Sequence, residues 1–113
     1  NEQLLFDRIA SEFLDLMVLY QGSPPWLEGQ RFDVWIPKIQ MAIEYNGQQH
    51  YEPVNFFGGD DGLAATQRRD EKKRNKCIEN NTFLLELQEG YDWNEVKLVI
   101  RERTASFYLN EKD

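Results

Sequence analysis

The sequence has one cysteine and one histidine among its 113 residues. The single Cys77 cannot form an internal disulfide, and it cannot supply the several thiolates of a cysteine-based zinc site. With His50 as the one imidazole, structural zinc is not expected either. This composition is typical of an intracellular protein, and we expect a cytoplasmic location.

Long apolar runs are also missing from the sequence. No stretch approaches the ~20 residues that a membrane helix needs, and no signal peptide is visible, so we expect no membrane partner. The chain has the length of one domain. Because it starts at Asn1, within a helical pattern and without methionine, we expect residues 1–113 to be a single domain excised from a longer protein with further domains.

Positive charge is scarce overall, with 13 Lys and Arg against 20 Asp and Glu and a net charge of −7. Such a balance argues against strong nucleic-acid binding, which depends on clustered basic residues. The charge is unevenly spread, however, because residues 67–76, "QRRDEKKRNK", hold six of the thirteen basic residues. This run predicts a local basic stripe, although a solvated helix face explains it equally well.

Hydrophobic periodicity predicts an α/β fold. Apolar residues recur at helical spacing in the first segment, and they alternate in "RFDVWIP", a strand that Pro37 ends. The expected helices span residues 2–19, 63–80 and 93–109, the last with Asp92 as its N-cap, and the expected strands span residues 18–20, 31–37, 39–46 and 82–87. The order α-β-β-β-α-β-α predicts a small central mixed β-sheet flanked by helices.

The short link between the second and third strands predicts an antiparallel hairpin, and residues 51–62, with Pro53 and three glycines, predict a long irregular loop. Strand alternation places Asp33 on the face of Trp35, with Phe32 and Val34 on the other face.

If Ile36 pairs with Met41 across the hairpin, Asp33 stands directly opposite Glu44. Asn46 shares the face of Glu44. Two opposed carboxylates repel each other unless a cation lies between them, and hard cations such as Mg²⁺ prefer such oxygen ligands. The hairpin therefore predicts a metal site that Asp33 and Glu44 form.

The helices add two more acids. Glu2 lies on the apolar stripe of Leu5 and Ile9, and Asp70 shares a stripe with Cys77, seven residues later. Each acid also has a structural interpretation. Glu2 favours the positive end of its helix dipole, and Asp70 can pair with a base on its own helix.

Glu44 can likewise pair with Arg31 across the sheet, and a lone His50 is more commonly a surface hydrogen-bonding residue than a catalyst. Five such residues near one sheet edge nevertheless favour a functional site.

The segments "RFDVWIP", "AIEYNGQQHYEPV", "FFGG" and "RRDEKKRNKC" resemble the PD-(D/E)XK nuclease superfamily. These segments are most similar to the branch of very-short-patch-repair-like and phage homing endonucleases. The similarity extends from the first helix to about Leu87. The resemblance implies a restriction-endonuclease-like core. It also implies a Mg²⁺- or Mn²⁺-dependent endonuclease that hydrolyses phosphodiester bonds in DNA, with RNA or a branched duplex as open alternatives.

Carried over by position, the resemblance gives each site residue a role. Asp33 resembles the metal-bridging aspartate and Glu44 the second carboxylate, while Glu2, His50 and Asp70 match the first-helix glutamate, the histidine after the glycine and the helix aspartate. Asn46 departs from the commoner Lys of the superfamily and from the Gln or Asp of this branch. Asparagine cannot bring a positive charge, a task that Gln48 and Gln49 are candidates to share.

His50 is the candidate general base, since imidazole exchanges protons near neutrality. The expected ligands of backbone phosphates are Gln48, Gln49, Arg68, Arg69, Lys72 and Lys73. Asn46 and the acidic surface also favour an alternative, in which a catalytically degenerate nuclease fold binds nucleic acid or protein. A calcium loop built on "GGDDG" is excluded, because the acceptor spacing is missing.

Overall fold

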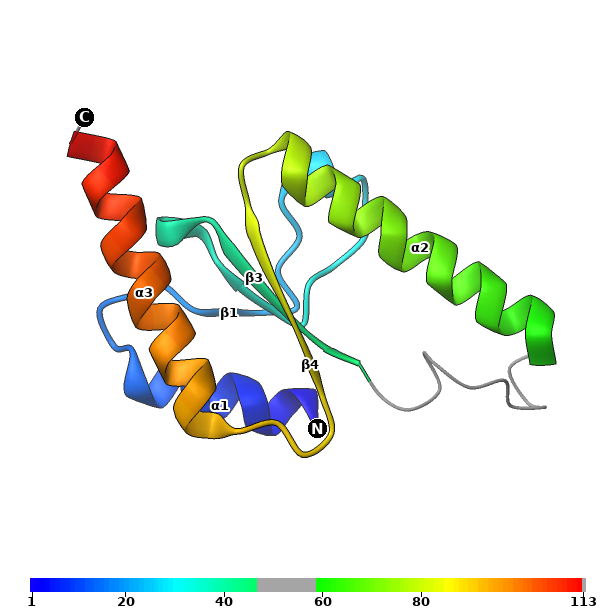
Figure 1. The fold of residues 1–113 in the computed structure, drawn as a ribbon, viewed down its shortest axis with the longest axis horizontal. Coiled ribbons are helices and arrows are strands. Elements are labelled where there is room, and N and C mark those ends of the chain that lie inside the picture. The colour runs from blue at the N-terminus through cyan, green and yellow to red at the C-terminus, as the bar shows by residue number, and fades with distance from the viewer. Residues whose placement is uncertain (47–58, 113) are drawn as a thin grey trace.

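The computed structural model describes residues 1–46 and 59–112, which form an α/β fold with a four-stranded mixed sheet and three α-helices (Figure 1). The elements along the chain are α1 (Glu2–Glu12), β1 (Leu19–Tyr20), a 3-10 turn (Pro25–Leu27), β2 (Val34–Ile36), a second 3-10 turn (Pro37–Ile39), β3 (Met41–Asn46), α2 (Gly59–Glu79), β4 (Phe83–Gln88) and α3 (Trp93–Lys112). The predicted order of helices and strands is confirmed.

The sheet has the strand order β1-β2-β3-β4. The first three strands are antiparallel neighbours, and β4 runs parallel to β3. Ile36 pairs with Met41 across the second 3-10 turn, as predicted. This register fixes which residues of β2 and β3 meet at the far end of the hairpin.

Helices cover both faces of the sheet. On one face, α1 and α3 pack against the strands, and the core there includes Leu5, Ile9, Val34, Ile36, Met41, Ile43, Val96 and Ile100. On the other face, under α2 and the first 3-10 turn, a smaller cluster holds Leu27, Phe32, Trp35, Ala42 and Cys77. Every second side chain of β3 points to this second face, namely Ala42, Glu44 and Asn46. The polar end of β3 therefore lies on the same face as α2.

The first helix is shorter than predicted, since it ends at Glu12 and not near residue 19. Phe13 caps it with φ −115° and ψ 71°, outside the helical region. Phe13 and Leu16 are both buried, and the chain turns back after the helix, so both side chains reach the core while β1 reaches the sheet. Tertiary packing here overrides the helical spacing of the sequence.

The predicted face of Phe32 was wrong. Phe32 packs with Trp35 under α2, not with Val34. Regular strand pairing begins only at Val34, and the Phe32 N–H donates to the Gly22 carbonyl at 2.9 Å, so simple alternation does not extend to this position.

The predicted loop also ends earlier than expected, because residues 59–62 belong to α2 and are helical; residues 51–58 lie outside the described residues. Neither this helix nor any other in the described part of the chain is long and apolar enough to cross a membrane.

Candidate functional site

A cavity of about 800 Å³ lies between the start of α1, the polar end of β3 and α2. Glu2, Asp33, Glu44 and Asp70 all line it. Three separate elements and the segment before β2 thus bring four of the predicted catalytic residues together. Asn46 lines the same cavity.

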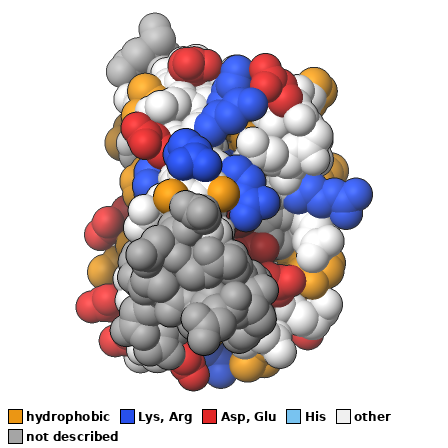
Figure 2. Space-filling model, turned by 90° about the vertical axis from the view of Figure 1, so that its right-hand side faces the viewer, with side chains coloured by type: hydrophobic (Ala, Val, Ile, Leu, Met, Phe, Trp, Pro, Cys, Tyr) orange, Lys and Arg blue, Asp and Glu red, His pale blue; other side chains and the backbone are white. Residues whose placement is uncertain are grey.

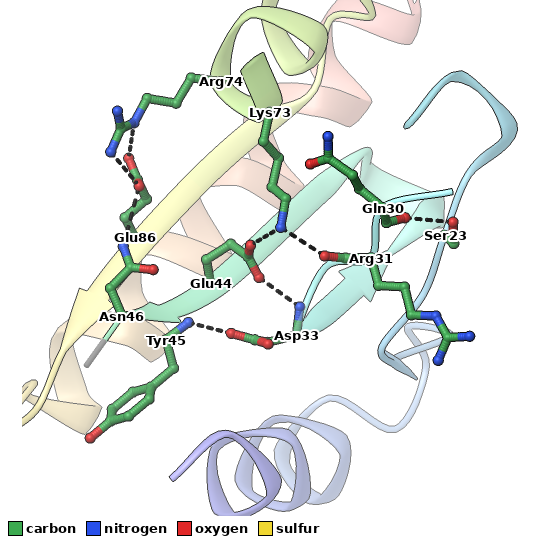
Figure 3. Close-up of polar contacts among 10 residues, drawn as sticks. All are labelled: Ser23, Gln30, Arg31, Asp33, Glu44, Tyr45, Asn46, Lys73, Arg74 and Glu86. Carbon is green, nitrogen blue, oxygen red and sulfur yellow. Dashed lines mark hydrogen bonds and ion pairs between the residues drawn. The ribbon is translucent and has the colours of Figure 1, made fainter. Parts of the chain in front are cut away.

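Asp33 and Glu44 lie side by side, and each carboxylate accepts a hydrogen bond from a backbone N–H of the other segment (Figure 3). The Asp33 N–H donates to Glu44 Oε2 at 2.7 Å, and the Tyr45 N–H donates to Asp33 Oδ2 at 2.7 Å. Regular strand pairing ends at the Val34–Ile43 pair, and beyond it these two backbone-to-side-chain bonds join the strands. The prediction that the two carboxyl groups lie next to each other is confirmed, although Asp33 and Glu44 are not a strand pair.

Two acids of the cavity, Asp33 and Glu2, have pKa values raised by burial and by a neighbouring carboxylate. Burial, followed by the charge of Glu44, raises the pKa of Asp33 to about 6. Burial and then the charge of Asp33 raise the pKa of Glu2 above its ordinary value. A cation beside these two acids would favour their charged forms.

Lys73 supplies one positive charge within the cavity. Its Nζ forms an ion pair with Glu44 Oε1 and donates to the Arg31 carbonyl at 2.8 Å, and it lies 5.7 Å from the centre of the Phe32 ring. The two ion-paired side chains are only 15% and 11% exposed. The alternative pairing of Glu44 with the Arg31 side chain was therefore wrong: Arg31 contributes its backbone oxygen, and Lys73 provides the charge.

A second polar network adjoins the first at the end of β3. Asn46 is buried, and its Nδ2 donates to Glu86 Oε1 of β4 at 3.3 Å. Arg74 holds the same carboxylate with two hydrogen bonds, of 2.8 and 2.9 Å. Asn46 is thus positioned by β4 and α2 as well as by its own strand. Sequence reasoning missed Glu86, whose alternation with Leu85 and Leu87 is the available signal.

The predicted phosphate ligands of α2 do not form one stripe. Lys72 pairs with Glu28 at 3.2 Å, whereas Lys73 faces Glu44 inside the cavity. Arg69 lines the cavity, and Arg68 is exposed on the same helix. Figure 2 shows basic side chains gathered on this face of the molecule.

Three of the predicted site residues, Gln48, Gln49 and His50, lie outside the described residues. Sequence reasoning did not include Tyr20, Gln30 or Arg31 in the site, although all three line the cavity. The position of Arg31, two residues before Asp33, was the available signal for it.

The donor set suits a hard divalent cation only in part. Asp33 and Glu44 offer carboxylate oxygens, which Mg²⁺ accepts together with water and phosphate oxygens. Within residues 1–46 and 59–112, however, no three His, Cys, Asp or Glu side chains form a group that could hold a metal ion. A cation bound by these two acids would therefore complete its coordination with water and substrate.

Comparison with known proteins finds matches of undescribed activity. The chain is 39% identical over 56 residues to the uncharacterized protein 307L of Invertebrate iridescent virus 6, and 43% identical over 56 residues to the uncharacterized protein 033L of Invertebrate iridescent virus 3. It is also 39% identical over 57 residues to the uncharacterized protein 094L of Frog virus 3.

Each of these alignments covers 49% of this chain, but only 28%, 29% and 37% of the respective relatives. The relatives are therefore much longer than the segment they share with this protein. No family model matches the chain, and no solved structure matches it.

Proposed function

We propose that this chain is a metal-dependent endonuclease domain that hydrolyses phosphodiester bonds in DNA. The observation that carries the proposal is the pair of carboxylates, Asp33 and Glu44, fixed side by side in an acid-lined cavity. The helix and strand order, with a parallel last strand beside an antiparallel hairpin, is compatible with a restriction-endonuclease-like core.

Asp33 and Glu44 would hold Mg²⁺ or Mn²⁺ through their carboxylate oxygens. Such a cation, when bound, polarises a phosphate and lowers the pKa of a coordinated water. Glu2, whose carboxyl interacts with Asp33, would orient that aspartate or a water beside it. Asp70 faces the same cavity from α2.

Lys73 is our candidate for the positive charge that Asn46 cannot provide. Its ammonium group lies beside Glu44 on the wall of the cavity, where it could donate to a phosphate oxygen of the substrate. Electrostatic stabilisation of developing negative charge by such a group is commonly a large catalytic term. His50 remains the candidate general base.

Cleavage of labelled oligonucleotides tests this proposal. We expect cutting of DNA with Mg²⁺ or Mn²⁺ and none with a chelator. Replacing the general base, His50→Ala, should slow cleavage by about 10²-fold or more. A parallel assay with RNA of the same sequence shows whether DNA or RNA is the substrate. Equal cleavage by the wild type and by His50→Ala, unaffected by chelator, would assign the activity to a contaminant and contradict the proposal.

A second candidate function is binding without catalysis by a degenerate nuclease fold. The observation that favours it is the Lys73–Glu44 ion pair, which neutralises one of the two carboxylates from within the protein. Oligonucleotide binding without any cleavage in Mn²⁺ would support this second function against the first.

A further inference from the structure

The basic residues of α2 fall into two groups when their partners are considered. Most are paired with acids of the protein itself: Lys72 and Lys76 with Glu28, Lys73 with Glu44, and Arg74 with Glu86. Arg68 and Arg69 are both exposed and form no ion pair with any described side chain. These two guanidinium groups therefore keep their charge available for an external anion.

A third arginine of the same kind lies on the other side of the cavity. Arg31, just before β2, lines the cavity together with Arg69 of α2. Its side chain is exposed, has no ion pair among the described residues and extends away from Lys73 (Figure 3). The acid-lined cavity thus has one available guanidinium on the segment before β2 and another on α2.

A shallow groove continues from the cavity along α2. Its volume is about 540 Å³. Gly62 has no side chain and Ala65 a small one, so neither fills the groove. Arg68 and Arg69 line this groove, and Arg69 also lines the cavity. The described contact of the Arg69 guanidinium is a 3.3 Å hydrogen bond to Thr66 Oγ1. This bond positions the guanidinium between the cavity and the groove, both of which Thr66 also lines.

We infer that a nucleic-acid backbone crosses the cavity between Arg31 and Arg69 and continues past Arg68 along α2. This inference rests on the proposed nuclease function and adds the path of its substrate. The planar guanidinium group of arginine can donate two hydrogen bonds to one phosphate. These contacts would recognise the backbone phosphates and would not depend on the base sequence. The path holds an anionic strand against an acid-lined cavity that would otherwise repel it.

Fluorescence anisotropy with a short, labelled single strand of mixed sequence tests the path. The titrations are made in chelator, so that no cleavage occurs, and at several salt concentrations. Arg31→Gln and Arg69→Gln should each weaken binding about three- to tenfold and reduce the salt slope by about 0.7, the loss of one phosphate contact on a single strand.

The matched control is Arg101→Gln, the same substitution at an exposed arginine of α3, on the other face of the sheet. Because Arg101 lines neither the cavity nor the groove, this variant should bind within about twofold of the wild type. Unchanged thermal unfolding of all the variants, whose replaced side chains are exposed, establishes that the fold is intact.

Two results would overturn the inference. In one, the double variant Arg31→Gln/Arg69→Gln keeps the affinity and salt slope of the wild type. In the other, the wild type shows no saturable binding even at low salt. Since binding is measured in chelator and cleavage with metal, failure of the path and failure of the nuclease function are separate outcomes.

Discussion

At the scale of single residues, Asp33 is both tightly positioned and electrostatically costly. Its backbone and its carboxylate are both bonded across the hairpin, so it cannot turn away from Glu44. Its pKa of about 6 lies well above the value near 4 of an exposed aspartate. A group whose folded-state pKa is raised destabilises the fold above that pKa, and the penalty is absent below the unfolded-state pKa.

Asp33→Asn should therefore raise the melting temperature at pH ~7. It should also remove part of the stabilisation that the wild type gains as pH falls from about 6 to about 4. Asparagine keeps the oxygen that accepts from the Tyr45 N–H. Thermal unfolding followed by circular dichroism across this range measures both effects, with the exposed Asp15→Asn as the control. A variant that unfolds outright would show that the acid is structural.

Lys73→Met should destabilise the domain by about 1–3 kcal/mol, because it leaves the largely buried Glu44 without its cation. Adding Glu44→Gln should recover much of the loss. A double-mutant cycle from urea denaturation measures this coupling. Additive effects, within about 0.3 kcal/mol, would show that the ion pair does not stabilise the fold.

At the scale of elements, the segment before β2 places Asp33, and a glycine makes its path possible. The Gly22 carbonyl accepts from the Phe32 N–H at 2.9 Å, and the Gln21 N–H donates to the Asp33 carbonyl at 2.9 Å. A Cβ atom at Gly22 would lie 2.6 Å from the Cβ of Trp35. Neither atom can move without the backbone, so the two segments can approach this closely only with glycine.

Gly22→Ala should accordingly cost about 1–3 kcal/mol of unfolding free energy, the range of overpacked cores. If the domain is active, cleavage should fall as well, because the backbone that carries Asp33 must shift. Urea denaturation measures the first effect. A loss below about 0.5 kcal/mol would mean that the two segments separate at little cost.

Sequence periodicity predicts the part of the site that lies on the hairpin, since a two-residue period and the Ile36–Met41 pair place Asp33 opposite Glu44. Helical periodicity also indicated that Lys73 faces the site, because Lys73 lies three residues after Asp70 and four before Cys77 on one helical stripe. The depth to which Lys73 reaches depends on how α2 packs on the sheet. The early end of α1 and the face of Phe32 likewise follow from tertiary contacts, which local spacing does not encode.

At the scale of the whole molecule, the net charge of −7 opposes the approach of DNA. We expect weak binding without sequence preference, and three available arginines imply a moderate salt dependence, below that of proteins with ~6–10 phosphate contacts. Gel-shift titration of two unrelated duplexes at two salt concentrations measures this. Tight binding of one duplex over the other would contradict the prediction. We propose that this domain acts together with further domains, which provide targeting.

Nicking of supercoiled plasmid tests the central claim most directly, namely that Asp33 and Glu44 support metal-dependent hydrolysis of DNA. The wild type, Asp33→Asn and the control Arg101→Gln, an exposed residue of α3 outside the cavity and the groove, are compared in Mn²⁺ and in chelator. The account predicts nicking by the wild type and the control in Mn²⁺ only, and none by Asp33→Asn. Equal nicking by Asp33→Asn and the wild type, or none by a folded wild type in Mn²⁺, would contradict it.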